Sequence, residues 1–354
     1  MTPSQLGSRV RFGHRQCVVR LGALSFRASW RAAVVVAALL AGAALVAVVA
    51  IGLGKYHIAP ADVLRVLIGT NTSFDRVVVL QWRMPRMLAG VLIGAALGLS
   101  GAIFQALTRN PLGSPDIIGV NAGAYTGALT ILATVGGGYY AVAGGALAGG
   151  IATAVAVYAL SYRRGIAGYR LIVVGIAVSA VLNSVNQWIV IKLDHHTAVT
   201  AAVWQQGTLN GLTWAQVIPL AVCLGLSTAA LLGVGPQLPI LQLGDDAAGA
   251  LGVRPEHARL AYLVIGVALV ALACAAAGPI TFVALAAPQL ARRLTASPGV
   301  ALVPAAAMGA VLLLLSDIIA QQLFRDNEIP VGAVTVTLGG TYLVYLLITG
   351  ARQR

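Results

Sequence analysis

The sequence is short of charge, and acidic residues are scarcer still. Only 9% of the 354 residues are charged, with 10 acidic against 23 basic side chains, whereas 59% are hydrophobic. A soluble protein carries about 25% charged residues. Because a water-facing fold cannot bury so much apolar surface, the composition excludes a soluble globular protein and predicts a chain embedded in lipid.

Motifs for chemistry are also missing. The sequence has no phosphate-binding G-x-x-x-x-G-K-[ST] pattern. His195 and His196 are adjacent, which is poor spacing for two metal ligands on one helix face, and the three cysteines (Cys17, Cys223 and Cys274) are widely spaced. We therefore expect no catalytic site, no metal site and no bound cofactor, so the energy for any pumping has to come from another subunit.

Charged side chains are nearly absent inside the apolar stretches. Asp317 is the best candidate for a charge within a span, where we expect a cavity to hydrate it. An acid at the bilayer centre costs roughly 2.5–3.5 kcal/mol on insertion scales, and proton-coupled carriers usually contain several. An ion-coupled secondary transporter is therefore disfavoured, although sodium sites built from backbone carbonyl groups stay open as an alternative.

Long apolar stretches fill most of the chain, at residues 32–54, 87–108, 117–162, 171–191, 197–244, 260–291, 294–324 and 329–351, and Asp317 is the one charged residue within them. A helix needs about 20 apolar residues to cross a bilayer. Residues 117–162 suffice for two spans, with a turn at 136–140. We predict an all-α, polytopic membrane protein of nine or ten helices. Glycines four residues apart, such as Gly90, Gly94 and Gly98, predict closely packed helices.

The arginines gather at the ends of these stretches, so the net charge of +13 does not indicate a nucleic-acid partner. Six of them precede the first span and predict a cytoplasmic basic tail over residues 1–31. A transmembrane domain follows over 32–351. Ten spans are preferred because an even count also places the tail 352–354 in the cytoplasm. The same count puts Arg83 and Arg86 outside, against the charge rule, which suggests a task for them.

The longest inner loop, residues 236–259, has helical sequence of its own. An Ala-rich stretch lies between a Gly-Asp-Asp start and a Gly-Val-Arg-Pro stop. Asp245 or Asp246 is well placed to cap the N-terminus of a short helix. The pattern predicts a structured cytoplasmic element, either for contact with a partner or as a capped loop helix without one.

Four segments, in order along the chain, resemble the iron-siderophore and vitamin B12 permeases of ABC importers. RMPRMLAGVLIGAALGLSGAIFQALTRNPLGSPDIIGVNAGA (83–124) carries the R-x-P-R opening and the N-P-L-x-x-P motif of that family. LGDDAAGALGV (243–253) is similar to its inner-loop segment, GPITFVALAAPQLARRL (278–294) to its G-x-I-x-F motif, and EIPVGAVTVTLGGTYLVYLL (328–347) to its last span. Within the family the chain is most similar to permeases for ferric catecholate siderophores of the enterobactin type.

The resemblance implies a type II ABC importer permease fold with about ten helices and no ATPase site of its own. In this family two such subunits pair around a central path in the cytoplasmic membrane, above two cytoplasmic ATPases that use ATP. The similarity to the enterobactin type favours a heterodimer with a second permease. The expected cargo is a ferric siderophore, and vitamin B12 or heme is the alternative within the family.

The resemblance also implies two contact sites. Arg83 and Arg86 match arginines that pair with acidic residues of an extracytoplasmic siderophore-binding protein, and plain anchoring at the membrane surface is the alternative. The coupling helices of the family dock in a groove of each ATPase. On this chain that role falls to Leu243, Gly244, Asp245, Asp246, Ala248, Leu251 and Gly252.

The translocation path is expected along the fifth span, which borders the path in this family. Its amide and hydroxyl side chains are Asn183, Ser184, Asn186 and Gln187. They are candidates for lining the path, and hydrogen bonding between helices is the equally weighted alternative. The outer segment Val203–Gly207 is a candidate for part of a gate. The usual histidine of the P-H-x-x-R motif is Gln289 here, so no role is assigned to that side chain.

Overall fold

The computed structural model describes residues 16–21, 24–54, 56–70, 74–136, 138–162, 168–234, 237–297, 299–323 and 329–351. Residues 1–15 of the predicted basic tail lie outside them. So do the predicted C-terminal tail 352–354 and Pro236, the first residue of the predicted inner loop.

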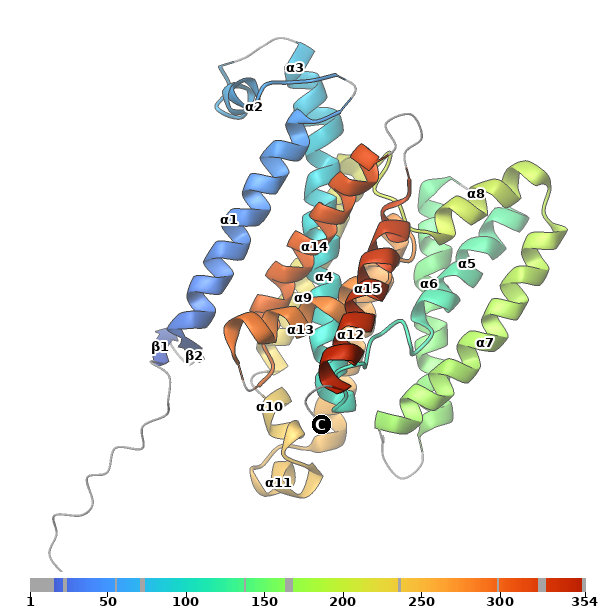
Figure 1. Ribbon diagram of the computed structural model, residues 1–354. Helices are drawn as coiled ribbons and strands as arrows, with labels where there is room; N and C mark the ends of the chain where they lie inside the picture. The colour runs from blue at the N-terminus through green and yellow to red at the C-terminus, as the bar shows by residue number, and fades with distance from the viewer. Residues whose placement is uncertain are drawn as a thin grey trace, which may run out of the picture.

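Helices make up nearly all of the described chain (Figure 1), as the composition predicts. The long helices are α1 (Trp30–Gly52), α4 (Met84–Thr108), α6 (Tyr139–Ser161), α7 (Gly168–Lys192), α9 (Trp214–Val234), α12 (Pro255–Ala277), α14 (Leu302–Leu323) and α15 (Val331–Ala351). The shorter ones are α2 (Pro60–Leu67), α3 (Phe74–Val77), α5 (Val120–Thr134), α8 (His195–Gln205), α10 (Gln237–Gln242), α11 (Asp245–Ala250) and α13 (Val283–Thr295). A π-helical turn, Val78–Arg83, joins α3 to α4.

Seven helices of the described part are long and apolar enough to cross a membrane, with Phe74–Thr108 counted as one. Helices α5 and α13 have 15 and 13 residues. At 1.5 Å per residue they extend about 22 and 20 Å, less than a hydrocarbon core about 30 Å thick. The predicted number of about ten is reached when α5, α13 and α15 are added to the seven.

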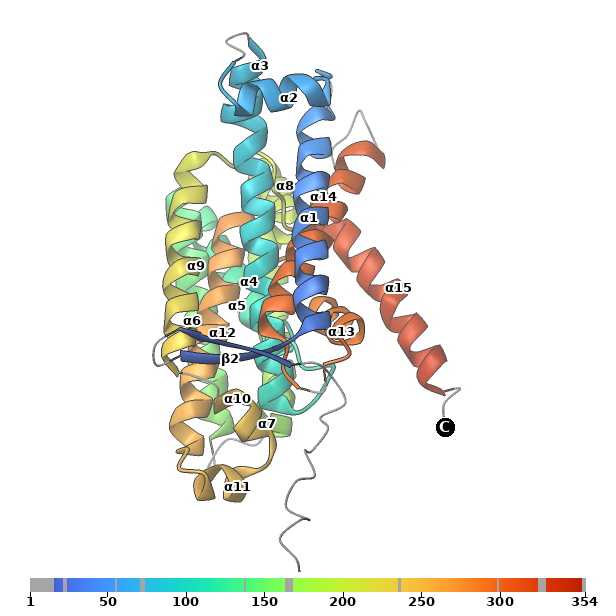
Figure 2. The same ribbon diagram turned by 90° about the vertical axis from the view of Figure 1, so that its left-hand side faces the viewer.

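A strand pair precedes the first span, and the sequence pattern does not predict it. Strand β1 (Gln16–Leu21) pairs antiparallel with β2 (Leu24–Ser29), with Gln16 opposite Ser29. Figure 2 shows β2 leading directly into α1. Ser29 then caps α1, because its side chain accepts a hydrogen bond from the backbone N–H of Ala32 at 3.2 Å.

The predicted glycine stripes lie where helices touch. A Cβ at Gly94 would lie 2.4 Å from the backbone oxygen of Gly309, and one at Gly98 would lie 2.1 Å from that of Ala305. These contacts join α4 to α14 along what we call the α4–α14 seam. In the same way, a Cβ at Gly127 would lie 1.9 Å from the backbone oxygen of Gly145 and join α5 to α6. The prediction of close backbone packing is confirmed.

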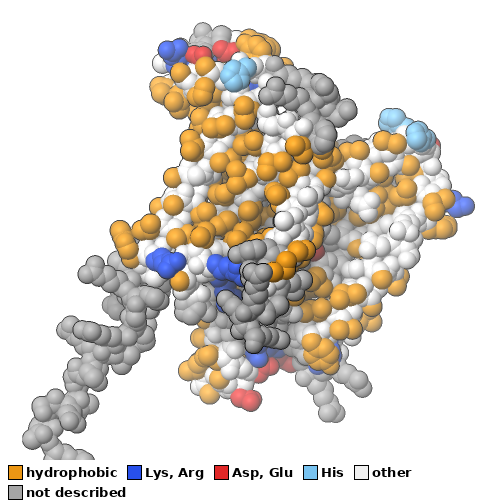
Figure 3. Space-filling model, viewed as in Figure 1, with side chains coloured by type: hydrophobic (Ala, Val, Ile, Leu, Met, Phe, Trp, Pro, Cys, Tyr) orange, Lys and Arg blue, Asp and Glu red, His pale blue; other side chains and the backbone are white. Residues whose placement is uncertain are grey.

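The bundle has two polar ends. Helices α2 and α3 lie at one end, together with the start of α4, and α10 and α11 lie at the opposite end (Figures 1 and 2). Charged side chains gather toward these ends, and hydrophobic ones cover most of the band between them (Figure 3). Helix α2 buries Val63 and Val66 on one of its faces. We call the α2–α3 end the outer end and the α10–α11 end the inner end, following the predicted orientation.

Candidate functional site

Arg83, at the outer end, caps the C-terminal end of α1 from the π-helical turn that precedes α4. Its guanidinium donates hydrogen bonds to the backbone oxygens of Ile51 and Tyr56. Ile51 lies in the last turn of α1, where carbonyl groups lack helical partners and the helix dipole favours a cation. Gly54 permits the approach, because a Cβ there would lie 2.7 Å from Nη2 of Arg83. Part of the donor capacity of Arg83 therefore serves the fold.

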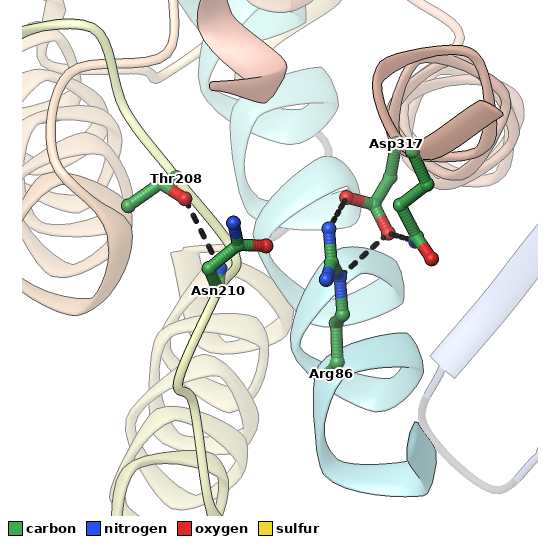
Figure 4. A network of polar contacts seen from close by, with 5 residues as sticks. Arg86, Thr208, Asn210 and Asp317 are labelled. Atoms are coloured by element: carbon green, nitrogen blue, oxygen red, sulfur yellow. Dashed lines mark hydrogen bonds and ion pairs between the residues drawn. The ribbon is translucent and has the colours of Figure 1, made fainter. Parts of the chain in front are cut away.

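Arg86 forms an ion pair with Asp317 across the α4–α14 seam (Figure 4). Nε of Arg86 donates to Oδ2 of Asp317 at 3.1 Å, and Nη2 donates to Oδ1 at 2.9 Å. The Asp317 side chain is 0% exposed and that of Arg86 is 17% exposed. The prediction of a hydrated cavity around Asp317 is therefore wrong. The carboxylate is enclosed, and a bidentate guanidinium neutralises its charge.

Two further polar side chains surround this pair. Gln321 lies one turn after Asp317 on α14, and its Nε2 donates to Oδ2 of Asp317 at 2.7 Å. Asn210 belongs to the loop that joins α8 to α9, and its backbone N–H donates to Oγ1 of Thr208 at 3.1 Å. Figure 4 shows the Asn210 amide facing the guanidinium of Arg86. The sequence analysis assigned no role to Asn210.

The inner end presents a short helix with an apolar rim. Gly244 precedes α11 with a φ of 113°, a conformation that favours glycine. Ala248, within the helix, is its buried residue. Leu243 and Leu251, just before and just after the helix, are 67% and 61% exposed. Gly252 ends the turn with a φ of 81°. The predicted helix is confirmed, and it carries two large apolar side chains in solvent.

The predicted cap of α11 differs from the observed one. Gly244 occupies the N-cap position, and no side chain caps the helix there. Asp245 and Asp246 lie in the first turn instead, where negative charge favours the helix dipole. Asp245 is drawn into an ion pair with Arg259 at 2.7 Å and lies 3.5 Å from Arg109. Because Arg109 follows α4 and Arg259 belongs to α12, these pairs tie the inner loop to two long helices.

The polar residues of α7 divide into two groups. Asn183, Ser184 and Gln187 are exposed. Asn186 is buried, and its Nδ2 donates to the backbone oxygen of Ala122 on α5 at 3.3 Å. Asn186 therefore bonds between helices, as one interpretation of the sequence predicts, and the other three side chains stay candidates for the path.

The candidate gate segment Val203–Gly207 is the end of α8 and the residues after it. Asp194 begins the helix, and its Oδ1 accepts a hydrogen bond from the backbone N–H of Thr197 at 3.1 Å. Hydrogen bonds from Thr197 hold the pKa of Asp194 below its usual value. At the end of the segment, the backbone N–H of Gly332 donates to the backbone oxygen of Gly207 at 3.2 Å, which joins the segment to α15.

Three comparisons with known proteins agree. A profile of the FecCD transport family matches residues 42–349. The ferric enterobactin transport system permease protein FepG of Escherichia coli is 47% identical over 303 residues, covering 85% of this chain and 91% of FepG. The achromobactin permease CbrC of Dickeya dadantii is 37% identical over 309 residues, covering 86% of this chain and 88% of CbrC. The chain belongs to the FecCD transport family.

The fold of this FecCD chain agrees with the same relationship. A solved metal-chelate type ABC transporter in an inward-facing conformation superposes with a TM-score of 0.80 at 26% identity. The match covers 90% of this chain and 99% of that one. With the apolar helices, the family establishes a multi-pass membrane protein. The resemblance drawn from the four sequence motifs is thereby confirmed.

Sequence reasoning found the elements of the FecCD chain but not the contacts between them. It selected Arg86 and Asp317 separately, and the fold brings them together across 231 positions of sequence. Gln289, to which no role was assigned, donates to the backbone oxygen of Pro111 at 2.6 Å and links α13 to the loop after α4. Such contacts leave no trace in local sequence patterns.

Proposed function

We propose that this chain is the transmembrane permease subunit of an ABC importer that carries a ferric siderophore across the cytoplasmic membrane. The 47% identity to a ferric enterobactin permease, over most of both chains, is the observation that carries this proposal. The chain itself would bind no cofactor, and separate ATPase subunits would use the ATP. The N- and C-termini would face the cytoplasm, with α11 on the same side.

The proposed partners follow from the two ends of the bundle. A binding protein that delivers the siderophore would dock at the outer end, around Arg83 and Arg86, through its own acidic side chains. Arginine suits this role because its planar fork binds a carboxylate through two hydrogen bonds. Two cytoplasmic ATPases would contact the inner end, one of them on this chain. A second, related permease would complete a heterodimer.

The proposed coupling surface is α11 and its flanks. Leu243 and Leu251 are exposed apolar side chains of the kind that fills a groove on a partner. Gly244 sets the angle at which α11 leaves α10, and its φ of 113° is closed to proline. Gly244→Pro should therefore uncouple ATP hydrolysis from uptake, and normal coupling in that variant would count against this surface.

The proposed path runs along the exposed face of α7. Amide side chains offer weak hydrogen bonds that let a large polar chelate move without tight binding. Replacing Asn183 and Gln187 with leucine should slow uptake. Asn186→Leu serves as the contrast, because Asn186 bonds to α5 and its loss should affect stability more than transport.

Reconstitution tests the whole proposal. The chain would be purified with its sister permease and ATPases, placed in liposomes, and supplied with ATP and loaded binding protein. Uptake of ferric siderophore that stops with an ATPase unable to hydrolyse ATP is the expected result. Uptake by the isolated chain down an ion gradient, with no ATPase present, would identify a secondary transporter instead.

A further inference from the structure

A buried acceptor without a partner lies beside the Arg86–Asp317 pair. Within the described part of the chain, Oδ1 of Asn210 is buried and has no hydrogen-bond partner. Figure 4 shows this oxygen directed toward the guanidinium of Arg86. Buried acceptors are nearly always satisfied in folded proteins, because an unmade hydrogen bond is destabilising. An unsatisfied oxygen opposite a cation is the arrangement expected if the cation has a second position.

The pair itself can be reached from the outer end. Arg86 lies in the first turn of α4 and retains some exposure, whereas Asp317 has none. Asp317 occupies one edge of the guanidinium, formed by Nε and Nη2. A carboxylate that arrives from outside therefore meets Arg86 first and has to compete with a carboxylate that is already in place.

The loop that carries Asn210 is tied to the neighbouring helices. The backbone N–H of Thr208 donates to Ala277 at the end of α12 at 2.7 Å. Leu209 is buried, and a Cβ at Gly90, one turn beyond Arg86, would lie 3.4 Å from its Cδ1. A shift of the guanidinium toward Asn210 would therefore act on a loop that is continuous with Val203–Gly207, the candidate gate segment.

From these contacts we infer that Arg86 exchanges between two acceptors. Asp317 holds it when no partner is docked, and an acidic side chain of the extracytoplasmic partner draws it toward Asn210. Asp317 thus opposes docking and Asn210 supports it, and the exchange transmits docking to the loop after α8. This inference rests on the proposed docking of a binding protein at the outer end.

The test measures docking and stability together. The complete transporter, in lipid nanodiscs, is titrated with a purified siderophore-binding protein that supports its uptake, and thermal unfolding is followed on the same samples. Asp317→Asn removes the competing charge and should tighten docking about tenfold while it lowers the unfolding temperature. Arg86→Gln combined with Asp317→Asn keeps neutral partners of similar shape and should weaken docking below that of the wild type.

Asn210→Ala should change docking affinity in the opposite direction from Asp317→Asn, without a loss of stability. It removes an unsatisfied oxygen, so the unfolding temperature should stay the same or rise, yet docking should weaken about fivefold. Ser316→Ala is the matched control, because the Ser316 hydroxyl bonds to Leu312 of its own helix and should change neither quantity. A residue that only maintains the fold would shift docking and stability in the same direction.

Docking equal to that of the wild type in both Asp317→Asn and Asn210→Ala would overturn the exchange. A change of docking affinity in the same direction in both variants would overturn it too. If Asp317→Asn fails to fold, Asn210→Ala decides alone, and unchanged docking rejects the inference. A wild-type transporter that binds no such protein would instead refute the proposed function. The two failures are therefore distinguishable.

Discussion

The two ends of the bundle treat their functional side chains in opposite ways. At the outer end, Arg83 caps α1 and Arg86 is paired with the enclosed Asp317. At the inner end, Leu243 and Leu251 project into solvent beside a helix that Asp245 fastens to α12 through Arg259. One end thus presents cations that are already engaged, and the other presents an apolar surface that the described residues leave exposed.

Under the proposed function, this difference means that the two ends would bind their partners by different routes. Exposed leucines need only desolvation on contact, so the inner end would suit the permanent subunit proposed for it. Engaged arginines have to exchange partners, and such exchange suits a contact that forms and dissolves in each transport cycle. The following predictions sharpen this contrast through the stability of the folded chain, from the largest expected effect to the smallest.

Breaking the outer ion pair should have the largest effect. Arg86→Leu leaves the Asp317 carboxylate buried without its cation, and such losses cost about 3–5 kcal/mol. The measurement is thermal or denaturant unfolding in detergent. Arg86→Leu combined with Asp317→Leu should recover most of the stability, because no buried charge is left. A single variant as stable as the wild type would contradict the ion pair.

The seam beneath this pair should respond next. Gly94→Ala places a methyl group 2.4 Å from the backbone oxygen of Gly309, which forces α4 and α14 apart at a cost of about 1–3 kcal/mol. Gly42→Ala on α1 is the matched control, because a Cβ there meets nothing within 4 Å. The control should gain about 0.5–1 kcal/mol from helix propensity. Equal unfolding temperatures in the two variants would argue against a closely packed seam.

Removing the cap of α1 should have a smaller effect. Arg83→Gln withdraws a cation from a helix C-terminus, an interaction of about 0.3–1 kcal/mol at partly exposed sites. Hydrogen exchange in the last turn of α1 should increase in this variant. Arg76→Gln, an exposed position on α3, should leave exchange unchanged. Identical exchange in both variants would return Arg83 to the role of a surface anchor.

Changing the inner leucines should leave stability almost unaltered. Leu243→Asp with Leu251→Asp alters exposed side chains, so the free energy of unfolding should stay within about 0.5 kcal/mol of the wild type. ATP-driven uptake should nevertheless be lost, and the two alanine replacements should give an intermediate rate. Lost stability in the aspartate variant would show that these leucines belong to the core rather than to a contact surface.

Local patterns predicted the elements of this chain well. The turn predicted at 136–140 overlaps the connection between α5 and α6, and the Gly-Asp-Asp start opens α11. The β1–β2 hairpin and the cap at Gly244 were missed. In the second of these, two adjacent aspartates suggested a side-chain cap, but Asp245 is drawn away by Arg259 from another helix.

By itself, the sequence determined that the chain lies in lipid, because its charged residues are too few for a water-facing fold. It also determined the family, because four ordered motifs are those of a FecCD chain. Only the tertiary structure decided which charges meet. Asp317 and Arg86 are 231 residues apart, and no periodicity along either helix encodes their contact. Hydropathy acts within one or two helical turns, whereas ion pairs depend on which helices pack together and in what register.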